Sequence, residues 1–201
     1  PHGYQPPATW WHRLYREFPE LELKQWITLP GKLDHDHGHG NFLAILQRLK
    51  TDRRLENHPW HAVILGGADP LDQQYLYQLQ AEVEQRQLHD CVTFVGRRQD
   101  RRDWLAASQL VLALPDNPDS VSRAILEALQ LGVPVVGWKR GLAGEWLEDF
   151  YPAGAIAPDD FESLYEHVVP LLCERQRIPA GPQHSLKAMT EGVLACYESL
   201  R

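Results

Sequence analysis

One segment of the sequence gathers residues that could bind a charged ligand. A short apolar run at Leu110–Leu114 leads through a polar loop into a stretch with helical spacing, Val121–Leu131. Ser120 and Ser122 stand where this helix would begin, and serine is a favoured N-cap residue. Unpaired backbone N–H groups at a helix start, together with the positive end of the helix dipole, attract anions such as phosphate. The segment therefore predicts an anion site near Ser122.

Two carboxylates accompany this expected helix start. Asp119 lies just before it and Glu127 follows eight residues later, which corresponds to roughly two turns of a continuous helix. One carboxylate could then hold a sugar at the mouth of a site while the other reaches the ribose of a nucleoside. Taken without context, the residues favour a simpler interpretation, in which Asp119 is a turn or capping residue and Glu127 a solvated helix carboxylate.

A second segment, Pro30–Gly40, is rich in histidine and aspartate. His and Asp are good ligands for zinc or nickel, so the run His35–His39 has a metal-site interpretation. Gly38 and Gly40, within and beside the histidine run, argue against a rigid ligand set, and no Cys, Glu or further His adjoins it. A solvated loop with a phosphate contact is favoured, and we expect no metal site.

Alternating β and helical patterns indicate the elements that position these residues. Six short apolar runs read as strands, at 25–29, 61–65, 91–95, 110–114, 133–137 and 155–157. Helical spacing occupies 41–49, 72–87, 100–107, 121–131, 144–150 and 161–173. This alternation predicts an α/β fold, a doubly wound parallel sheet of about six strands with helices on both faces. Ligands bind such sheets beyond the carboxyl ends of the strands, where both polar segments would lie.

The pattern predicts one α/β domain over residues 25–175 with a segment at each end. Residues 1–24 carry Pro6-Pro7 and an aromatic helix, Trp10–Phe18, which is either an interdomain extension or a simple packing helix. Residues 176–201 contain a final amphipathic helix, Ser185–Leu200, that packs on the domain or crosses from it. Because the chain starts at Pro1 rather than Met, we expect a further segment upstream.

Composition narrows the classes of protein that fit. With 43% hydrophobic and 23% charged residues, the 201-residue chain is typical of a globular protein. The formal net charge of −7 argues against a general nucleic-acid binder, so an anionic ligand would need a local site. No apolar run is long enough to span a bilayer, and no signal peptide is visible. Three scattered cysteines favour a reducing compartment such as the cytoplasm.

Several ordered motifs carry a resemblance to a known family. Residues 114–137 resemble the signature of the retaining GT-B glycosyltransferases of group 1 (family 4), through Glu127-Ala128 and Gly132–Val136. The glycine-rich loop that follows, with Gly144-Glu145, is similar as well. The stretches Ile64–Gly67, Val92–Arg97 and Trp104–Leu114 also look like the family. The resemblance covers roughly residues 1–175.

The resemblance implies a fold, an activity and partners. The chain would be the Rossmann-like C-terminal half of a GT-B enzyme, which binds a nucleotide-diphosphate sugar and transfers the sugar, with retention, to a glycan, lipid or other acceptor. No metal or other cofactor would be required. An N-terminal acceptor-binding half would be absent, so this fragment alone should bind but not turn over. The full-length protein would work in cell-envelope polysaccharide biosynthesis in the cytoplasm, with peripheral association at the inner face of the membrane.

The resemblance also assigns roles to single residues. Glu127 would accept hydrogen bonds from the ribose hydroxyls, and the backbone near Ser122 and Arg123 would face the diphosphate. Arg97 would lie beside the base, and Asp119 would contact hydroxyls of the donor sugar. Lys32 and His37 would supply positive charge to the donor phosphates. Two glycines that follow the first two strands complete the expected nucleotide site: Gly31 and Gly66.

Departures from the family pattern support an alternative. Lys32 replaces an arginine and His37 a lysine, Asp119 stands where glutamate is usual, and Leu142 replaces a glycine. A charged hydrogen bond contributes about 1.5–3 kcal/mol, so a weakened cation could cost roughly one to two decades in rate. The alternative is a degenerate relative that serves as an interaction or scaffolding module. An epimerase or another nucleotide-binding α/β enzyme shares the sheet and stays open, as do the base, the sugar and the acceptor.

Overall fold

The computed structural model describes residues 3–69, 73–120 and 122–179. The predicted helix Ser185–Leu200 lies outside these residues. Across the described ranges, no helix is both long and apolar enough to cross a bilayer.

A six-stranded parallel sheet forms the centre of the fold. The strands lie in the order β3-β2-β1-β4-β5-β6, and Ile27 of β1 pairs with Ala62 of β2 on one side and Leu110 of β4 on the other. This order confirms the predicted doubly wound sheet, and the winding reverses between β1 and β4. The strands are β1 Gln25–Pro30, β2 Trp60–Leu65, β3 Val92–Phe94, β4 Leu110–Ala113, β5 Val135–Trp138 and β6 Ala155–Ile156.

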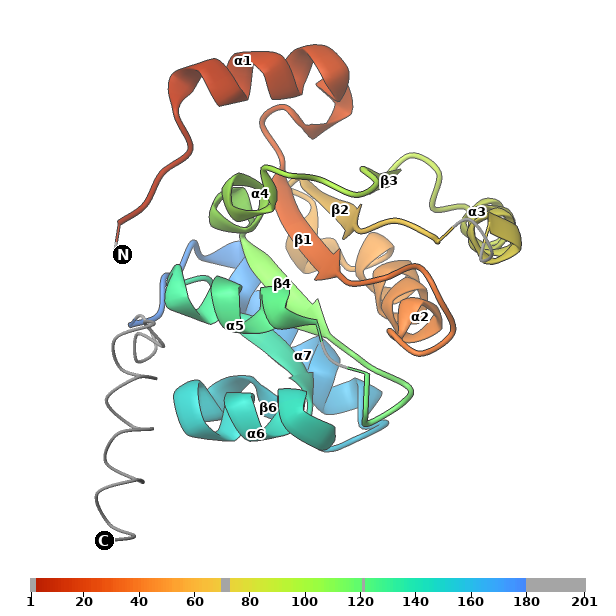
Figure 1. Ribbon diagram of the computed structural model, residues 1–201, viewed down its shortest axis with the longest axis vertical. Coiled ribbons are helices and arrows are strands. Elements are labelled where there is room, and N and C mark those ends of the chain that lie inside the picture. The colour runs from red at the N-terminus through yellow and green to blue at the C-terminus, as the bar shows by residue number, and fades with distance from the viewer. Residues whose placement is uncertain (1–2, 70–72, 121, 180–201) are drawn as a thin grey trace, which may run out of the picture.

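Helices cover both faces of the sheet, and each face has its own apolar core (Figure 1). Along β4, Leu110 and Leu112 face one core while Val111 and Ala113 face the other, which explains why the whole strand is apolar. One face carries α2 His39–Lys50, α3 Gln73–Gln85 and α7 Phe161–Cys173. The opposite face carries α1 Ala8–Glu17, α4 Arg101–Ala107, α5 Arg123–Gln130 and α6 Gly141–Phe150.

Several predicted boundaries are wrong by a few residues, and glycines account for two of them. Helix α2 begins at His39 rather than at residue 41, because Gly38 takes the left-handed conformation (φ 77°) and ends the preceding loop earlier. Helix α6 begins at Gly141 (φ 58°) rather than at Gly144. Strand β5 extends to the buried Trp138, which pairs with Ile156 of β6.

Helix α1 packs on the α4 side of the sheet through an aromatic cluster. The rings of Trp10 and Trp104 meet edge to face with centroids 5.8 Å apart, and Trp26 lies beside both. The Trp10 indole also donates a 2.7 Å hydrogen bond to Asp100 Oδ2. Trp10 and Leu14 are buried and belong to the same core as α5 and α6.

The chain after α7 returns to the other face of the sheet. Arg177 donates to the carbonyl of Ala106 at 2.8 Å, and the Ile178 N–H donates to Gly132 O at 3.0 Å. Because Ile178 packs with the α4–α6 core while α7 packs with the α2 core, this return links the two faces.

Candidate functional site

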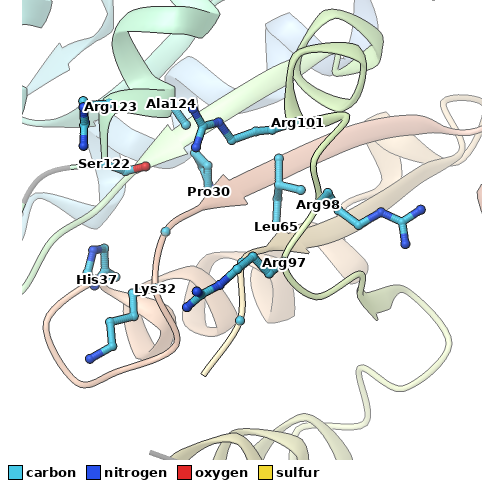
Figure 2. Close-up of a pocket in the computed structure, with 13 residues that line it drawn as sticks. Pro30, Lys32, His37, Leu65, Arg97, Arg98, Arg101, Ser122, Arg123 and Ala124 are labelled. Carbon is cyan, nitrogen blue, oxygen red and sulfur yellow. The ribbon is translucent and has the colours of Figure 1, made fainter. Parts of the chain in front are cut away.

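A cavity of about 340 Å³ opens beyond the carboxyl ends of the central strands (Figure 2). It lies where loops after β1, β2 and β3 meet the start of α5, at the point where the strand order reverses. Open α/β sheets bind their ligands at such a switch point. The lining residues are Pro30, Gly31, Lys32, His37, Leu65, Gly66, Gly67, Arg97, Arg98, Arg101, Ser122, Arg123 and Ala124.

The lining is positively charged although the whole chain carries a formal charge of −7. Among the described residues, the lining includes one lysine and four arginines but no Asp or Glu. The Arg98 guanidinium is turned away (Figure 2) and forms a two-point ion pair with Glu17, at 2.7 and 3.0 Å. The remaining cations, Lys32, Arg97, Arg101 and Arg123, make this a local site for an anion.

The start of α5 adds backbone donors to these cations. Ser122 is the N-cap residue in extended conformation, and its hydroxyl makes no capping hydrogen bond to the helix. Ser122 lines the cavity together with Arg123 and Ala124 of the first turn, whose N–H groups have no partner within an α-helix. Since Ala124 has a small side chain, a phosphate can approach this end of the helix closely.

Glycines let the first two loops come together beneath the cavity. A Cβ atom on Gly66 would lie 1.6 Å from Gly31 O, so the backbones after β1 and β2 are in contact. A Cβ atom on Gly31 would lie 2.7 Å from Cδ2 of the His37 ring, so that ring packs directly on the Gly31 backbone. Both predicted glycines therefore occupy positions where a larger residue would displace the lining.

Charged side chains alternate in sign along this edge of the cavity. Asp69 lies between Arg97 (Nη2–Oδ1 2.9 Å) and Lys32 (Nζ–Oδ2 3.2 Å). Asp34 lies between Lys32 (Nζ–Oδ2 3.8 Å) and His37 (Nδ1–Oδ1 2.6 Å). Hydrogen bonds from Lys32 and then Arg97 hold the pKa of Asp69 below its ordinary value. The two carboxylates thus lie outside the lining and tether the cations that form it.

Glu127 lies outside the first cavity and is paired with Arg101, which lines that cavity. The Arg101 guanidinium donates to both carboxylate oxygens of Glu127, at 3.0 and 2.5 Å. Glu127 lines a second cavity of about 580 Å³ between α4 and α5, and Arg101 lines both cavities. The second cavity is bordered by Arg98, Gln99, Arg101, Arg102, Glu127, Gln130 and Leu131. A ligand that reaches from the first cavity to Glu127 must therefore pass Arg101.

The structure brings together most, but not all, of the predicted site residues. Asp119 is exposed and lies outside the first cavity, and its backbone N–H donates to Asn117 Oδ1 at 3.0 Å within the loop. Leu142, which stands where the family pattern has a glycine, is exposed on α6 and lies outside the lining. The predicted residues that share the cavity are Gly31, Lys32, His37, Gly66, Arg97, Ser122 and Arg123, whereas Asp119 and Glu127 do not line it.

Sequence reasoning missed Arg101. Arg101 belongs to a basic cluster, Arg97–Arg102, and is the first residue of α4, a position typical of a solvated side chain. Its side chain turns back over the end of the sheet to the cavity (Figure 2). The signal that points to it is position, because the cluster directly follows β3 at the carboxyl edge of the sheet.

The histidines of the segment after β1 contact different neighbours. Over the described residues, no group of three or more His, Cys, Asp or Glu is placed to hold a metal ion. His35 and His39 pack against the Tyr75 ring, with centroids 4.3 and 5.6 Å away. Burial lowers the pKa of His39 to about 4, and its Nδ1 lies 3.2 Å from the backbone carbonyl oxygen of Asp34. Only His37 lines the cavity.

A curated relative covers most of this chain. Over 188 residues the chain is 25% identical to the lipopolysaccharide core biosynthesis mannosyltransferase LpsB of Rhizobium meliloti (strain 1021). The match covers 88% of this chain and 52% of the relative. The chain therefore spans about half the length of the curated relative that it matches.

Solved structures share the fold. HepE from Anabaena, in complex with UDP and glucose, is similar with a TM-score of 0.70 at 19% identity, over 98% of this chain and 54% of HepE. The C-terminal domain of the group 1 glycosyl transferase LpcC from Francisella tularensis gives a TM-score of 0.61 at 19% identity, over 85% of this chain and 86% of that domain. These likenesses support the fold of the C-terminal half of a GT-B glycosyltransferase. The family model "Glycosyl transferases group 1" matches residues 24–174, and the chain belongs to that family.

Proposed function

We propose that this chain is the donor-binding half of a retaining hexosyltransferase, which transfers a sugar from a nucleotide-diphosphate sugar to a glycan, lipid or other acceptor. The observation that carries the proposal is the cationic cavity at the start of α5, in a member of the group 1 glycosyl transferases. The complexes of HepE with UDP and with UDP-glucose support a nucleotide-sugar as the ligand.

The diphosphate occupies the first cavity in this proposal. The N–H groups at Ser122 and Arg123 bind its oxygens, while Lys32 and His37 neutralise the charge that grows on the departing diphosphate. Arg97 lies beside the base, and Asp119 contacts the donor sugar at the outer edge. Positioning and electrostatic stabilisation then supply the rate enhancement without a metal ion.

The ribose extends toward Glu127, which requires an exchange of partners. In the structure Arg101 holds both oxygens of the Glu127 carboxylate. Ribose hydroxyls replace the Arg101 guanidinium there, and the released guanidinium turns to the nearby phosphates. Because one hydrogen-bonded contact replaces another, the net cost of this exchange is small.

The remaining parts of the reaction belong to the absent half of the enzyme. The acceptor and any catalytic base come from an N-terminal domain, so the chain alone binds the donor but does not turn it over. We further propose that the full-length protein acts in cell-envelope polysaccharide synthesis at the cytoplasmic face of the membrane. The lipopolysaccharide role in the name of LpsB supports this setting.

Titration calorimetry of the chain with UDP, GDP and ADP tests donor binding. We expect a Kd of millimolar or tighter for one nucleotide, and about 10- to 150-fold weaker binding in Lys32→Gln, since a charged hydrogen bond contributes about 1.5–3 kcal/mol. Arg53→Gln is the control: this exposed arginine precedes β2, at the opposite edge of the sheet. Absence of binding to all three nucleotides would contradict the proposal.

The internal ion pairs favour one alternative, an interaction module that has lost donor binding. Lys32 and Arg97 both pair with Asp69, and Arg101 pairs with Glu127, so three cations of the cavity already have anionic partners. If the site has decayed, the double change Lys32→Arg and His37→Lys restores the family pattern and creates nucleotide binding that the wild type lacks. Comparable binding before and after the change contradicts the alternative.

A further inference from the structure

The imidazole of His37 is held by a carboxylate that does not itself line the cavity. Asp34 Oδ1 lies 2.6 Å from His37 Nδ1, and the same oxygen accepts the backbone N–H of Asp36 at 3.0 Å. Both side chains are largely shielded from solvent, with 15% of the His37 and 20% of the Asp34 side chain exposed. Burial acts to raise the pKa of Asp34, but the hydrogen bonds from His37 and Asp36 outweigh it, so the pKa lies below its ordinary value. Asp34 is therefore an anion that faces Nδ1 of the ring.

Packing contacts fix the orientation of the rest of the His37 ring. The Gly31 backbone lies against Cδ2, as described above. Ser120 Oγ lies 3.3 Å from Nδ1 and 3.2 Å from Nε2, and such nearly equal distances put it over the ring rather than along either N–H direction. Since Nδ1 is engaged by Asp34, Nε2 is the atom that can serve a ligand in the cavity.

Backbone contacts hold the loop in place. The Leu33 N–H donates to Gly67 O at 3.2 Å, which ties the loop to the segment after β2. The Asp116 N–H donates to Asp36 O at 3.0 Å, which ties it to the segment after β4. A Cβ atom on Gly38 would lie 1.7 Å from Leu114 O, so the loop end is in close contact with the end of β4. The Asp34–His37 pair thus belongs to a fixed loop at the cavity wall.

From this geometry we infer that Asp34 is a positioning residue, which turns His37 into a protonated, phosphate-binding cation and makes donor binding depend on pH. The inference rests on the proposed function. Asp34 stabilises the imidazolium through Nδ1, and Nε2–H donates to a donor phosphate. A lysine at position 37 would need no such partner, because an ordinary lysine carries its charge well above neutral pH.

Other charged groups near the ring do not produce the same pH dependence. The charged groups come from the loop of His37 itself, from the start of α2, and from the segments after β2, β3 and β4. They are Lys32, Asp34 and Asp36; His39; Asp69; Arg97; and Asp116, Asp119 and Arg123. Ordinary lysine, arginine and aspartate side chains keep one charge state between pH 5.5 and 8.5. Burial raises the pKa of Asp116, but Asp116 is retained in every variant below. Burial puts the pKa of His39, at about 4, below that window. The exposed His35 is retained in every variant below, so its contribution cancels.

Titration calorimetry between pH 5.5 and 8.5 tests the inference. The ligand is UDP-glucose, or GDP-mannose or ADP-glucose if one of those binds more tightly. A nucleotide sugar is chosen because its diphosphate, esterified at both ends, does not titrate in this range. For the wild type we expect Kd to rise about tenfold from pH 6 to pH 8, because loss of the imidazole proton removes one cation from the phosphate site. In His37→Lys, Kd should stay constant across the range.

Asp34→Asn separates positioning from a merely structural role. In the wild-type background we expect about fivefold weaker binding near pH 6.5 and a loss that shrinks toward pH 8.5, because Asp34 acts only on the protonated imidazole. In the His37→Lys background Asp34→Asn should cause no loss. Thermal melts verify that each variant is folded.

Three outcomes decide between the explanations. An equal loss of affinity in Asp34→Asn at every pH and in both backgrounds would overturn the inference in favour of a structural role. Wild-type binding that does not change with pH would overturn it as well, while leaving the proposed function intact. No binding of any nucleotide sugar at any pH contradicts the proposed function, and the inference with it.

Discussion

The Glu127 side chain is the most specific test of how a nucleotide lies on this domain. If its carboxylate binds the ribose, Glu127→Ala should weaken UDP binding about 10- to 150-fold, the equivalent of about 1.5–3 kcal/mol. The same change should leave binding of 2′,3′-dideoxyuridine diphosphate unaltered, since that ligand lacks both hydroxyls. Gln130→Ala, on the same helix and lining the same second cavity, is the matched control.

Titration calorimetry with both nucleotides measures the effect. An equal loss for UDP and its dideoxy analogue would show that Glu127 acts through Arg101 rather than on the ribose. The free carboxylate would then serve to orient the guanidinium that lines the first cavity.

Single residues that follow the strands could be assigned to the cavity from the sequence, whereas the pairs that side chains form with one another could not. Gly31, Ser122 and Arg123 line the cavity because their positions follow directly from the strand order. Glu127 and Arg101 are 26 residues apart and lie on different helices, and no local pattern encodes their pairing. The contact between the Asp34 carboxylate and the His37 ring likewise depends on the conformation of the loop, which the residue types alone do not specify.

At the scale of elements, the junction between the loop after β1 and helix α2 depends on Gly38. Gly38→Ala should lower the free energy of unfolding by about 3 kcal/mol, because φ is 77° and the added Cβ would lie 1.7 Å from Leu114 O. Gly40→Ala, two residues later in α2, meets no atom within 4 Å and should raise stability by about 0.5 kcal/mol.

Urea unfolding of the two variants measures this difference. Similar stabilities for Gly38→Ala and Gly40→Ala would show that the loop can move away from β4. Donor binding should fall in Gly38→Ala as well, since the same loop carries Lys32 and His37 to the cavity.

The type and order of elements could be predicted from hydrophobic periodicity alone, but their ends could not. Six apolar runs gave six strands, since parallel strands buried on both faces need continuous apolar residues. The starts of α2 and α6 depend on glycine conformations and on contacts with distant carbonyls, Leu114 O for Gly38 and Pro118 O for Gly141. Periodicity within a helix contains no information about such contacts.

For the molecule as a whole, the first helix contributes to the core of the domain. Trp10→Ala should lower the free energy of unfolding by about 3–5 kcal/mol, because the Trp10 indole is buried against Trp26 and Trp104 and donates to Asp100. Trp11→Ala, one residue later and only half-buried, should cost about 1 kcal/mol. Chemical unfolding followed by circular dichroism compares the two. An equally small loss in both would mean that α1 docks without supporting the sheet.

The two central strands carry a consequence for synthesis of the protein. Ile27 pairs with Leu110, so one side of β1 has no neighbour until 83 further residues have been added. At about 5–20 residues per second, a ribosome needs roughly 4–17 s for that stretch. During that interval the nascent chain holds β1 with a bare hydrogen-bonding edge, and an unpaired edge invites association with other chains. The same arrangement that creates the cavity at the reversal of the sheet thus gives β1 the longest wait for its second neighbour, since later strands such as β4 are paired within 24 residues.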